Sequence, residues 1–86
     1  MDKWAAVEGA PYPLGVSFVK ADGAYNFSLY SKHATGLTLH LYARDDPVNP
    51  SYSYRFDYLK NKSGRVWHCR VPAAVADQAS YYGYQV

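Results

Sequence analysis

The sequence predicts an all-β domain folded as an antiparallel sandwich, and three observations lead to this prediction. Ten of the 86 residues are tyrosine, and 17% are aromatic, a bias toward side chains that suit a pleated, half-buried surface. Apolar and polar residues alternate with a period of two over short segments. Turn signals separate these segments at the spacing of a small sandwich. The predicted strands lie at residues 15–20, 24–31, 37–43, 51–59, 65–71 and 80–86.

The first two strands show how the sheet faces are assigned. The strand over 15–20 follows two prolines, which favour an extended lead-in and mark a sheet edge. The strand over 24–31 places Tyr25, Phe27 and Leu29 on one face and mainly polar residues on the other. We therefore expect this strand to bury one face only.

The middle of the chain alternates most clearly. Residues 37–43 point three leucines to one side, so we expect these leucines in the core. The following stretch, 44–50, holds two prolines and the acidic pair Asp45 and Asp46, and it is predicted to be a surface loop. Adjacent carboxylates on a loop do not flank a scissile bond as the two carboxyls of a glycosidase do. They are interpreted as solvated charges.

The strand over 51–59 has one aromatic face, formed by Tyr52, Tyr54, Phe56 and Tyr58. A polar turn over 60–64 leads into the strand over 65–71. In that strand we expect an inward row of Trp67, Cys69 and Val71.

The end of the chain carries two further expectations. Residues 73–79 are predicted to form a loop or one helical turn after Pro72. The strand over 80–86 runs to the last residue, which we interpret as one domain, 1–86, excised from a longer protein.

Composition excludes several classes of protein. A chain with 49% hydrophobic and 19% charged residues is too apolar to be disordered, and 86 residues suffice for one domain. No apolar run reaches the ~18–20 residues of a membrane helix. A net charge of +2 is too small for a nucleic-acid footprint. We therefore expect neither a membrane nor a nucleic acid as a partner.

The single cysteine and the N-terminal residues bear on the compartment. Cys69 has no second cysteine with which to form an internal disulfide, which fits a reducing environment. The first residues lack the apolar core and the cleavage site of a signal peptide. We therefore predict a cytoplasmic protein.

The titratable residues form no catalytic or metal-binding pattern. His33, His40, His68 and Cys69 lack the spacing of metal ligands, so neither a metal nor another cofactor is predicted. His68 and Cys69 are strand neighbours on opposite faces, so we expect a buried thiol beside a surface imidazole. The sequence contains no glycine-rich phosphate loop and no G-x-S-x-G motif. No catalytic residue is predicted, and the chain is not expected to be an enzyme by itself.

The residues do offer a possible sugar-binding surface. Sugars present apolar faces and hydroxyl edges, which aromatic platforms and flanking polar side chains recognise. The candidate platforms are Trp4, Trp67 and the outward-facing tyrosines, and the candidate polar partners are Lys60, Asn61 and Lys62. The competing interpretation places the aromatic residues in the core or at a domain contact, which is more frequent in small sandwiches. Stacking of single-stranded nucleic acid is a minor alternative because the net charge is low.

Several short motifs occur in an order and spacing typical of one known family. They are Pro13-Leu14-Gly15, Asn26-Phe27-Ser28-Leu29-Tyr30-Ser31-Lys32-His33-Ala34, Leu37-Thr38-Leu39-His40-Leu41-Tyr42, Gly64-Arg65-Val66-Trp67-His68, Val71-Pro72 and Tyr82-Gly83-Tyr84-Gln85-Val86. Together they resemble the N-terminal domain of isoamylases and glycogen debranching enzymes of the α-amylase superfamily, a family-48 carbohydrate-binding module. The resemblance covers nearly the whole chain from Pro11.

This resemblance implies an immunoglobulin-like β-sandwich ahead of a (β/α)₈ barrel that hydrolyses α-1,6 branch points in glycogen or related glucans. The barrel is the implied partner within the same protein, and it would hold the catalytic carboxylates. The module would pack on the barrel and help to position the α-glucan weakly or indirectly. Glycogen-binding relatives stack sugar on two tryptophans beside a lysine and an asparagine, and this chain lacks that segment in recognisable form. The alternative is a stand-alone β-sandwich protein-interaction module with no sugar role.

The shared motifs also contain residues for which we expect structural roles: Asn26, Phe27, Tyr82, Gly83 and Tyr84. Asn26 is expected to satisfy neighbouring backbone groups. Gly83 is expected to let another backbone or ring approach closely. His33 is expected to hydrogen-bond its own loop or to contact the barrel.

Overall fold

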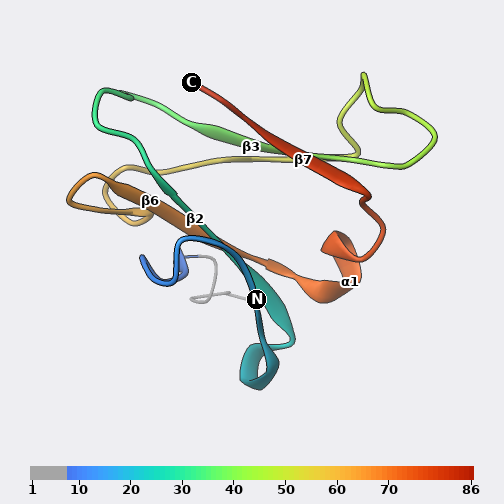
Figure 1. Cartoon of the computed structure of the whole chain (residues 1–86), viewed down its shortest axis with the longest axis horizontal. Coiled ribbons are helices and arrows are strands. Elements are labelled where there is room, and N and C mark those ends of the chain that lie inside the picture. The colour runs from blue at the N-terminus through green and yellow to red at the C-terminus, as the bar shows by residue number, and fades with distance from the viewer. Residues whose placement is uncertain (1–7) are drawn as a thin grey trace.

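The computed structural model describes residues 8–86, which form two antiparallel sheets packed face to face (Figure 1). The strands are β1 (Gly15–Val19), β2 (Ala24–Tyr30), β3 (Thr38–Tyr42), β4 (Tyr52–Arg55), β5 (Lys62–Ser63), β6 (Val66–Pro72) and β7 (Tyr81–Gln85). A turn of 3-10 helix spans Lys20–Asp22, and α1 spans Ala73–Ala76. This architecture confirms the predicted all-β antiparallel sandwich.

The two sheets differ in width within the described residues. One sheet has the strand order β1-β2-β6-β5, and the other has the order β4-β3-β7. Figure 1 shows β3 and β7 in one layer and β2 and β6 in the other, with α1 between β6 and β7 at one end. The four-stranded sheet is therefore one strand wider than the three-stranded sheet that faces it.

The core fills the space between the sheets and follows the period-two pattern of the sequence. Its buried members are Phe27, Leu37, Leu39, Leu41, Phe56, Trp67, Cys69 and Val71. The three leucines and the inward row on β6 are where the alternation predicts them. The edge of the Phe56 ring faces Trp67, with ring centroids 6.1 Å apart and planes at 89°.

The predicted strand over 51–59 is too long. β4 ends at Arg55, Phe56 is still buried, and Tyr58 is 62% exposed. The chain turns here because Asp57 is tied locally: its side chain accepts the Leu59 N–H at 2.9 Å, and its N–H donates to Asn61 Oδ1 at 2.9 Å.

The predicted turn over 60–64 contains an additional short strand. Lys62 and Ser63 form β5, which pairs with Trp67 and Val66 of β6. The reversal between the two strands uses Gly64, whose φ of 63° lies in the left-handed region. The connection between β5 and β6 is therefore only two residues long, shorter than the predicted turn over 60–64.

The loop over 44–50 is a surface loop, and Asp46 organises it. Its carboxylate accepts the N–H groups of Val48 and Asn49, at 3.2 and 3.0 Å. These hydrogen bonds, first of all the one from the Asn49 backbone, lower the pKa of Asp46. Asp45 is exposed. The acidic pair thus consists of a loop-forming residue and a solvated charge.

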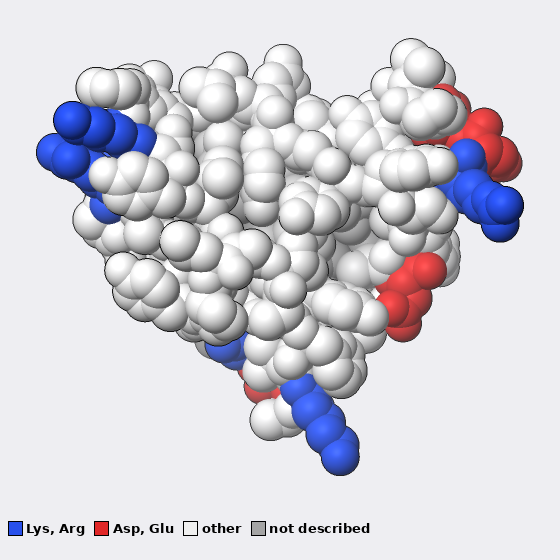
Figure 2. Space-filling model, viewed as in Figure 1, with Lys and Arg blue, Asp and Glu red and all other residues white. Residues whose placement is uncertain are grey.

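The remaining segment, 73–79, begins with the single turn of α1. Within residues 8–86 no helix has the length and apolar character needed to cross a membrane. Charged side chains lie around the periphery of the face shown in Figure 2, and the middle of that face carries none.

Candidate functional site

The outer face of β2 and β6, predicted to be a polar surface, is buried. Asn26, Ser28 and His68 point away from the core, yet they are only 1%, 3% and 5% exposed. The N-terminal segment 8–11 lies over them and hydrogen-bonds all three. The expectation that β2 buries one face and that His68 is a surface imidazole is therefore wrong, because a distant segment covers this face.

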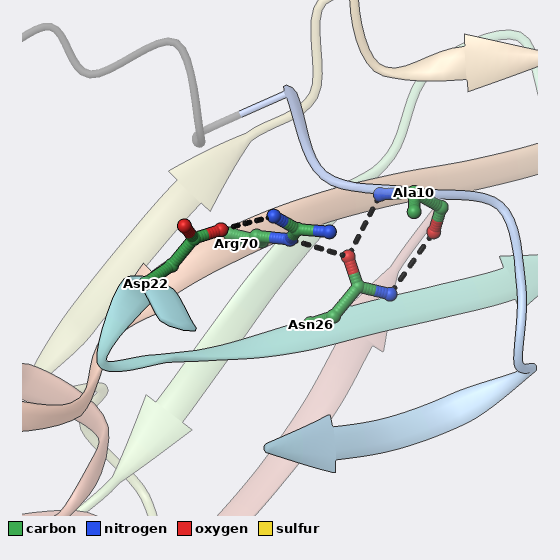
Figure 3. Close-up of polar contacts among 4 residues, drawn as sticks. All are labelled: Ala10, Asp22, Asn26 and Arg70. Atoms are coloured by element: carbon green, nitrogen blue, oxygen red, sulfur yellow. Dashed lines mark hydrogen bonds and ion pairs between the residues drawn. The ribbon is translucent and has the colours of Figure 1, made fainter. Parts of the chain in front are cut away.

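Asn26 holds this segment through both ends of its amide (Figure 3). The Oδ1 atom accepts the Ala10 N–H at 2.8 Å, and Nδ2 donates to the Ala10 carbonyl at 2.9 Å. The amide thus pairs with Ala10 as a neighbouring strand would. Arg70 Nε donates to the same Oδ1 at 3.3 Å, and the Arg70 guanidinium forms an ion pair with Asp22.

Ser28 and His68 extend the attachment along the segment. Ser28 Oγ donates to the Pro11 carbonyl at 2.5 Å. His68 Nδ1 lies against the Glu8 carbonyl, and His68 Nε2 lies 2.8 Å from Ser63 Oγ. Because a carbonyl only accepts, Nδ1 carries the proton in a neutral ring and Nε2 accepts from the Ser63 hydroxyl.

Gly9 allows the close approach that these bonds require. A Cβ at this position would lie 2.7 Å from the backbone carbon of Cys69 and 2.8 Å from Asn26 Oδ1. Its φ of 68° is in the left-handed region. We call segment 8–11 together with Asn26, Ser28 and His68 the N-terminal clamp.

The second candidate region surrounds Trp67 of β6, which lies between β2 and the edge strand β5. Trp67 is 1% exposed, so neither ring face is open to a sugar. Lys62 Nζ lies 5.3 Å from the ring centroid, a cation–π distance. The indole Nε1 is buried and has no hydrogen-bond partner within the described part of the chain. Trp67 is therefore a core residue and not a platform, because β5 and Phe56 enclose it.

Asn61 is also a structural residue. It is 1% exposed, and its Oδ1 accepts the Tyr54 hydroxyl and the Asp57 N–H, both at 2.9 Å. Its carbonyl accepts the His68 N–H at 2.7 Å. These bonds fix the turn over 57–61, which exposes Tyr58, Leu59 and Lys60.

The other predicted site residues are dispersed. Lys60 and His33 are exposed, and His33 lies in the connection between β2 and β3. Trp4 lies outside the described residues. The structure thus brings Lys62 to Trp67 and places Lys60 on the adjacent turn, whereas His33 is in a separate loop.

On β7, Tyr84 packs against the core, whereas Tyr82 lies at its margin and is 50% exposed. Tyr82 meets Phe27 edge to face at 5.5 Å, and Tyr84 lies 5.9 Å from Tyr82. A Cβ at Gly83 would meet Tyr42 Cε2 at 4.0 Å, an ordinary contact. The close approach expected at Gly83 is therefore not present among the described residues.

Neither region is built for covalent chemistry. Burial raises the pKa of Cys69 to about 12, so the thiol stays protonated and unreactive at neutral pH. Within residues 8–86 no three His, Cys, Asp or Glu side chains lie close enough to hold a metal ion. His40 bridges strands instead, with Nδ1 2.7 Å from Ser53 Oγ and Nε2 2.9 Å from Gln85 Oε1.

Curated relatives with similar sequences are much longer than this chain. Isoamylase 2, chloroplastic, of Arabidopsis thaliana is 36% identical over 63 residues, which are 73% of this chain and 7% of that protein. Isoamylase 3, chloroplastic, of Oryza sativa subsp. japonica is 36% identical over 83 residues, which are 91% of this chain and 10% of that protein. The chain therefore spans a tenth or less of these relatives. The chloroplastic location of these relatives contradicts the predicted cytoplasmic location, because neither a lone cysteine nor the character of the first residues specifies the cytosol.

Solved structures share the fold. The Group B Streptococcus pullulanase SAP in complex with maltotetraose superposes with a TM-score of 0.63 at 18% identity, over 85% of this chain and 10% of that one. The catalytic module of the multi-modular glycogen-degrading pneumococcal virulence factor SpuA superposes with a TM-score of 0.64 at 15% identity, over 92% of this chain and 11% of that one. At these low identities the superpositions show a shared fold and nothing about function.

A family model covers most of the sequence. The model of carbohydrate-binding module 48, described as the isoamylase N-terminal domain, matches residues 13–86. These residues include all seven strands and the three side chains of the N-terminal clamp, Asn26, Ser28 and His68. The chain therefore belongs to the carbohydrate-binding module 48 family of isoamylase N-terminal domains.

Proposed function

We propose that this chain is the non-catalytic N-terminal module of an isoamylase-type enzyme that hydrolyses α-1,6-glucosidic branches in an α-glucan. The observation that carries the proposal is the family match over residues 13–86 together with isoamylase relatives that are about ten times as long. In such a protein the catalytic carboxylates belong to a separate (β/α)₈ barrel. The module's task is to pack on the barrel and to help position the glucan.

The surface supports a packing role. Apolar side chains are exposed on the segment that leads into β1, where Tyr12 is 69% and Leu14 54% exposed. The fixed turn over 57–61 adds Tyr58 and Leu59, which are 62% and 77% exposed. Large apolar side chains that are both rigidly held and exposed are typical of contact surfaces.

Direct glucan contact is the smaller part of the proposal. Trp67 and Asn61 are buried, so Lys60, Lys62 and His33 remain as the candidate contacts among the described residues. The buried Trp67 is not available as a platform, and an exposed tyrosine such as Tyr58, on the same turn as Lys60, offers a single ring that binds sugars weakly. We infer that the module alone has millimolar affinity for malto-oligosaccharides or none.

Two experiments test the proposed function. In the first, the enzyme encoded by the parent gene is assayed for reducing ends released from glycogen and from a linear α-1,4-glucan, with and without this module. We expect activity on the branched substrate only, and a loss of activity or thermal stability when the module is removed. A parent protein without debranching activity contradicts the proposal.

The second experiment titrates the 86-residue chain with maltoheptaose in a calorimeter and incubates it with glycogen. We expect at most millimolar affinity and no hydrolysis. Binding much tighter than millimolar would replace the packing role with a true glucan-binding role. Hydrolysis by the chain alone would contradict the assignment as a non-catalytic module.

A further inference from the structure

Among residues 8–86 the sandwich is open along one side, where no strand lies opposite β1. The Phe27–Tyr82 ring contact at 5.5 Å places β7 over β2. β7 is the last strand of its sheet within residues 8–86, whereas the facing sheet continues from β2 to β1. The inner face of β1 is therefore uncovered in the described part of the chain. We call the surface formed by Val16, Phe18, Tyr25, Phe27 and Tyr82 the open seam.

The exposed side chains of the open seam are on the core-facing side of the sheet. Val16 is paired with Phe27 and Phe18 with Tyr25, so each shares a face with a residue that points into the sandwich. Val16 is nevertheless 40% exposed and Phe18 54% exposed. A cavity of about 280 Å³, lined by Val16, Tyr25, Phe27 and Tyr82 among others, lies between the sheets here. Exposure of these apolar side chains to water is unfavourable, so burial of this surface by another part of a protein would be favourable.

β7 also presents a free strand edge beside the seam. It pairs with β3 on one side only, so the peptide groups of its other edge have no strand partner among residues 8–86. Natural edges are protected by proline, lysine, bulges or inward charges. The β7 sequence Tyr81-Tyr82-Gly83-Tyr84-Gln85 has none of these residue types. The edge strand β1, in contrast, follows two prolines at Pro11 and Pro13.

We propose that an extended segment of the same enzyme, outside this module, pairs with the free edge of β7 and covers the open seam as a fourth strand. This inference rests on the proposed function, because it takes the occupant from a longer enzyme. Neighbouring strands lie ~4.7–4.9 Å apart, so a strand added to β7 would extend the narrower sheet across β1. The curated relatives contain about ten times as much polypeptide as this chain, which makes such a segment available.

The open seam also defines the chemistry of that segment. The cavity at the seam is lined mainly by aromatic and aliphatic residues; its other members are Ser80 and Asp77, and the Asp77 carboxylate already accepts the Tyr25 hydroxyl at 2.9 Å. The middle of the face in Figure 2 is likewise without charged side chains. The segment is therefore expected to alternate, with apolar residues at every second position facing the seam.

Hydrogen–deuterium exchange tests the pairing directly. Peptides that cover 81–86 are compared between the 86-residue chain and the full enzyme encoded by the parent gene. We expect these amides to exchange at least about tenfold more slowly in the full enzyme, because a new ladder protects them. A peptide that covers β3, which is paired on both edges, serves as the internal control and should exchange equally in both proteins. Equal exchange of 81–86 in both proteins overturns the proposal.

A matched pair of substitutions tests the cover. Val16→Lys places a charge on the seam, and Val48→Lys places the same charge on the loop, where Val48 is 78% exposed. In the 86-residue chain both variants should melt within about 2 °C of the wild type, because a lysine at either site reaches water. In the full enzyme only Val16→Lys should lower the melting temperature of the module, by about 5 °C or more. Equal effects of the two variants in the full enzyme overturn the proposal.

The remaining outcomes separate this inference from the proposed function. Dimers of the 86-residue chain with protected 81–86 amides, combined with unprotected amides in the full enzyme, would make a second copy the occupant and overturn the proposal. Debranching activity with unprotected 81–86 amides overturns the proposal of an added strand and leaves the proposed function intact. Protected 81–86 amides in a parent protein without debranching activity support the added strand and overturn the proposed function.

Discussion

The side chain of Asn26 and the backbone of Ala10 form a reciprocal pair: the amide oxygen accepts the Ala10 N–H at 2.8 Å, and the amide nitrogen donates to the Ala10 carbonyl at 2.9 Å. The two residues are 16 positions apart. One side chain on β2 thereby replaces a strand and attaches the N-terminal segment to the outer face of the sheet. The family motif that begins at Asn26 has a structural explanation in this pair.

Removing the Asn26 amide should destabilise the fold strongly. Asn26→Ala leaves the Ala10 N–H and carbonyl without their partners in a buried site, which we expect to lower the free energy of unfolding by about 2–4 kcal/mol. Urea unfolding followed by circular dichroism measures this change. The control is Asn49→Ala in the exposed loop, which should cost no more than about 1 kcal/mol. Equal losses in the two variants contradict the role given to the clamp.

Two glycine substitutions separate backbone strain from steric exclusion. Gly9→Ala and Gly23→Ala both place an alanine at a left-handed φ, 68° and 59°, which costs about 1–2 kcal/mol. Of the two, only Gly9 would place the new Cβ against backbone, 2.7 Å from Cys69, whereas a Cβ at Gly23 would have no atom of residues 8–86 within 4 Å. Gly9→Ala should therefore lose at least about 1 kcal/mol more stability by urea unfolding. A smaller loss at Gly9 than at Gly23 would mean that segment 8–11 does not pack as described.

The fluorescence of Trp67 should not respond to sugar. In a Trp4→Phe variant Trp67 is the single tryptophan, and its 1% exposure predicts blue-shifted emission and weak quenching by acrylamide. Addition of maltoheptaose should leave this emission unchanged. Free tryptophan amide under the same conditions provides the control for nonspecific quenching. A sugar-dependent change in the emission of Trp67 would show that the ring is accessible and would restore it as a platform candidate.

The buried thiol should make the fold sensitive to alkali. Burial raises the pKa of Cys69 from 9.0 to about 12, so above pH 9 the unfolded thiol loses its proton while the folded thiol keeps it. Its contribution to stability is thus complete below pH 9 and is lost as the pH rises toward 12, with a slope of up to about 1.4 kcal/mol per pH unit. Urea midpoints at pH 8–11 should fall more steeply for the wild type than for Cys69→Ala. Parallel curves contradict this effect, since tyrosine ionisation is common to both proteins.

The core could be predicted from the sequence because it depends on local alternation. Leu37, Leu39 and Leu41 follow one another at a period of two, and they are at most 2% exposed. The same rule assigns Trp67 to the inward side of β6. It cannot decide whether a tryptophan on the inward side is fully enclosed, which here depends on β5 and on Phe56 from the other sheet.

The outer face of β2 and β6 could not be predicted in the same way. Polar residues at every second position are typical of a solvent-facing surface, and Asn26, Ser28 and His68 fit that pattern. Their burial depends on a segment that meets His68 across 60 residues. The sequence does contain one sign of this contact. Gly9, just before the two prolines of the extended lead-in, is a residue type that allows close approach of the backbone to the sheet.

The sequence by itself determined the fold class, the alternation of the strands and the membership of the carbohydrate-binding module 48 family of isoamylase N-terminal domains, because these depend on residue order and local backbone geometry. The tertiary structure alone decided that the polar face of β2 is covered, that Trp67 and Asn61 are enclosed, and that no strand in the described part of the chain lies opposite β1. The physical reason is that side-chain direction is a local property of a strand. Whether anything lies in that direction depends on contacts between distant parts of the chain.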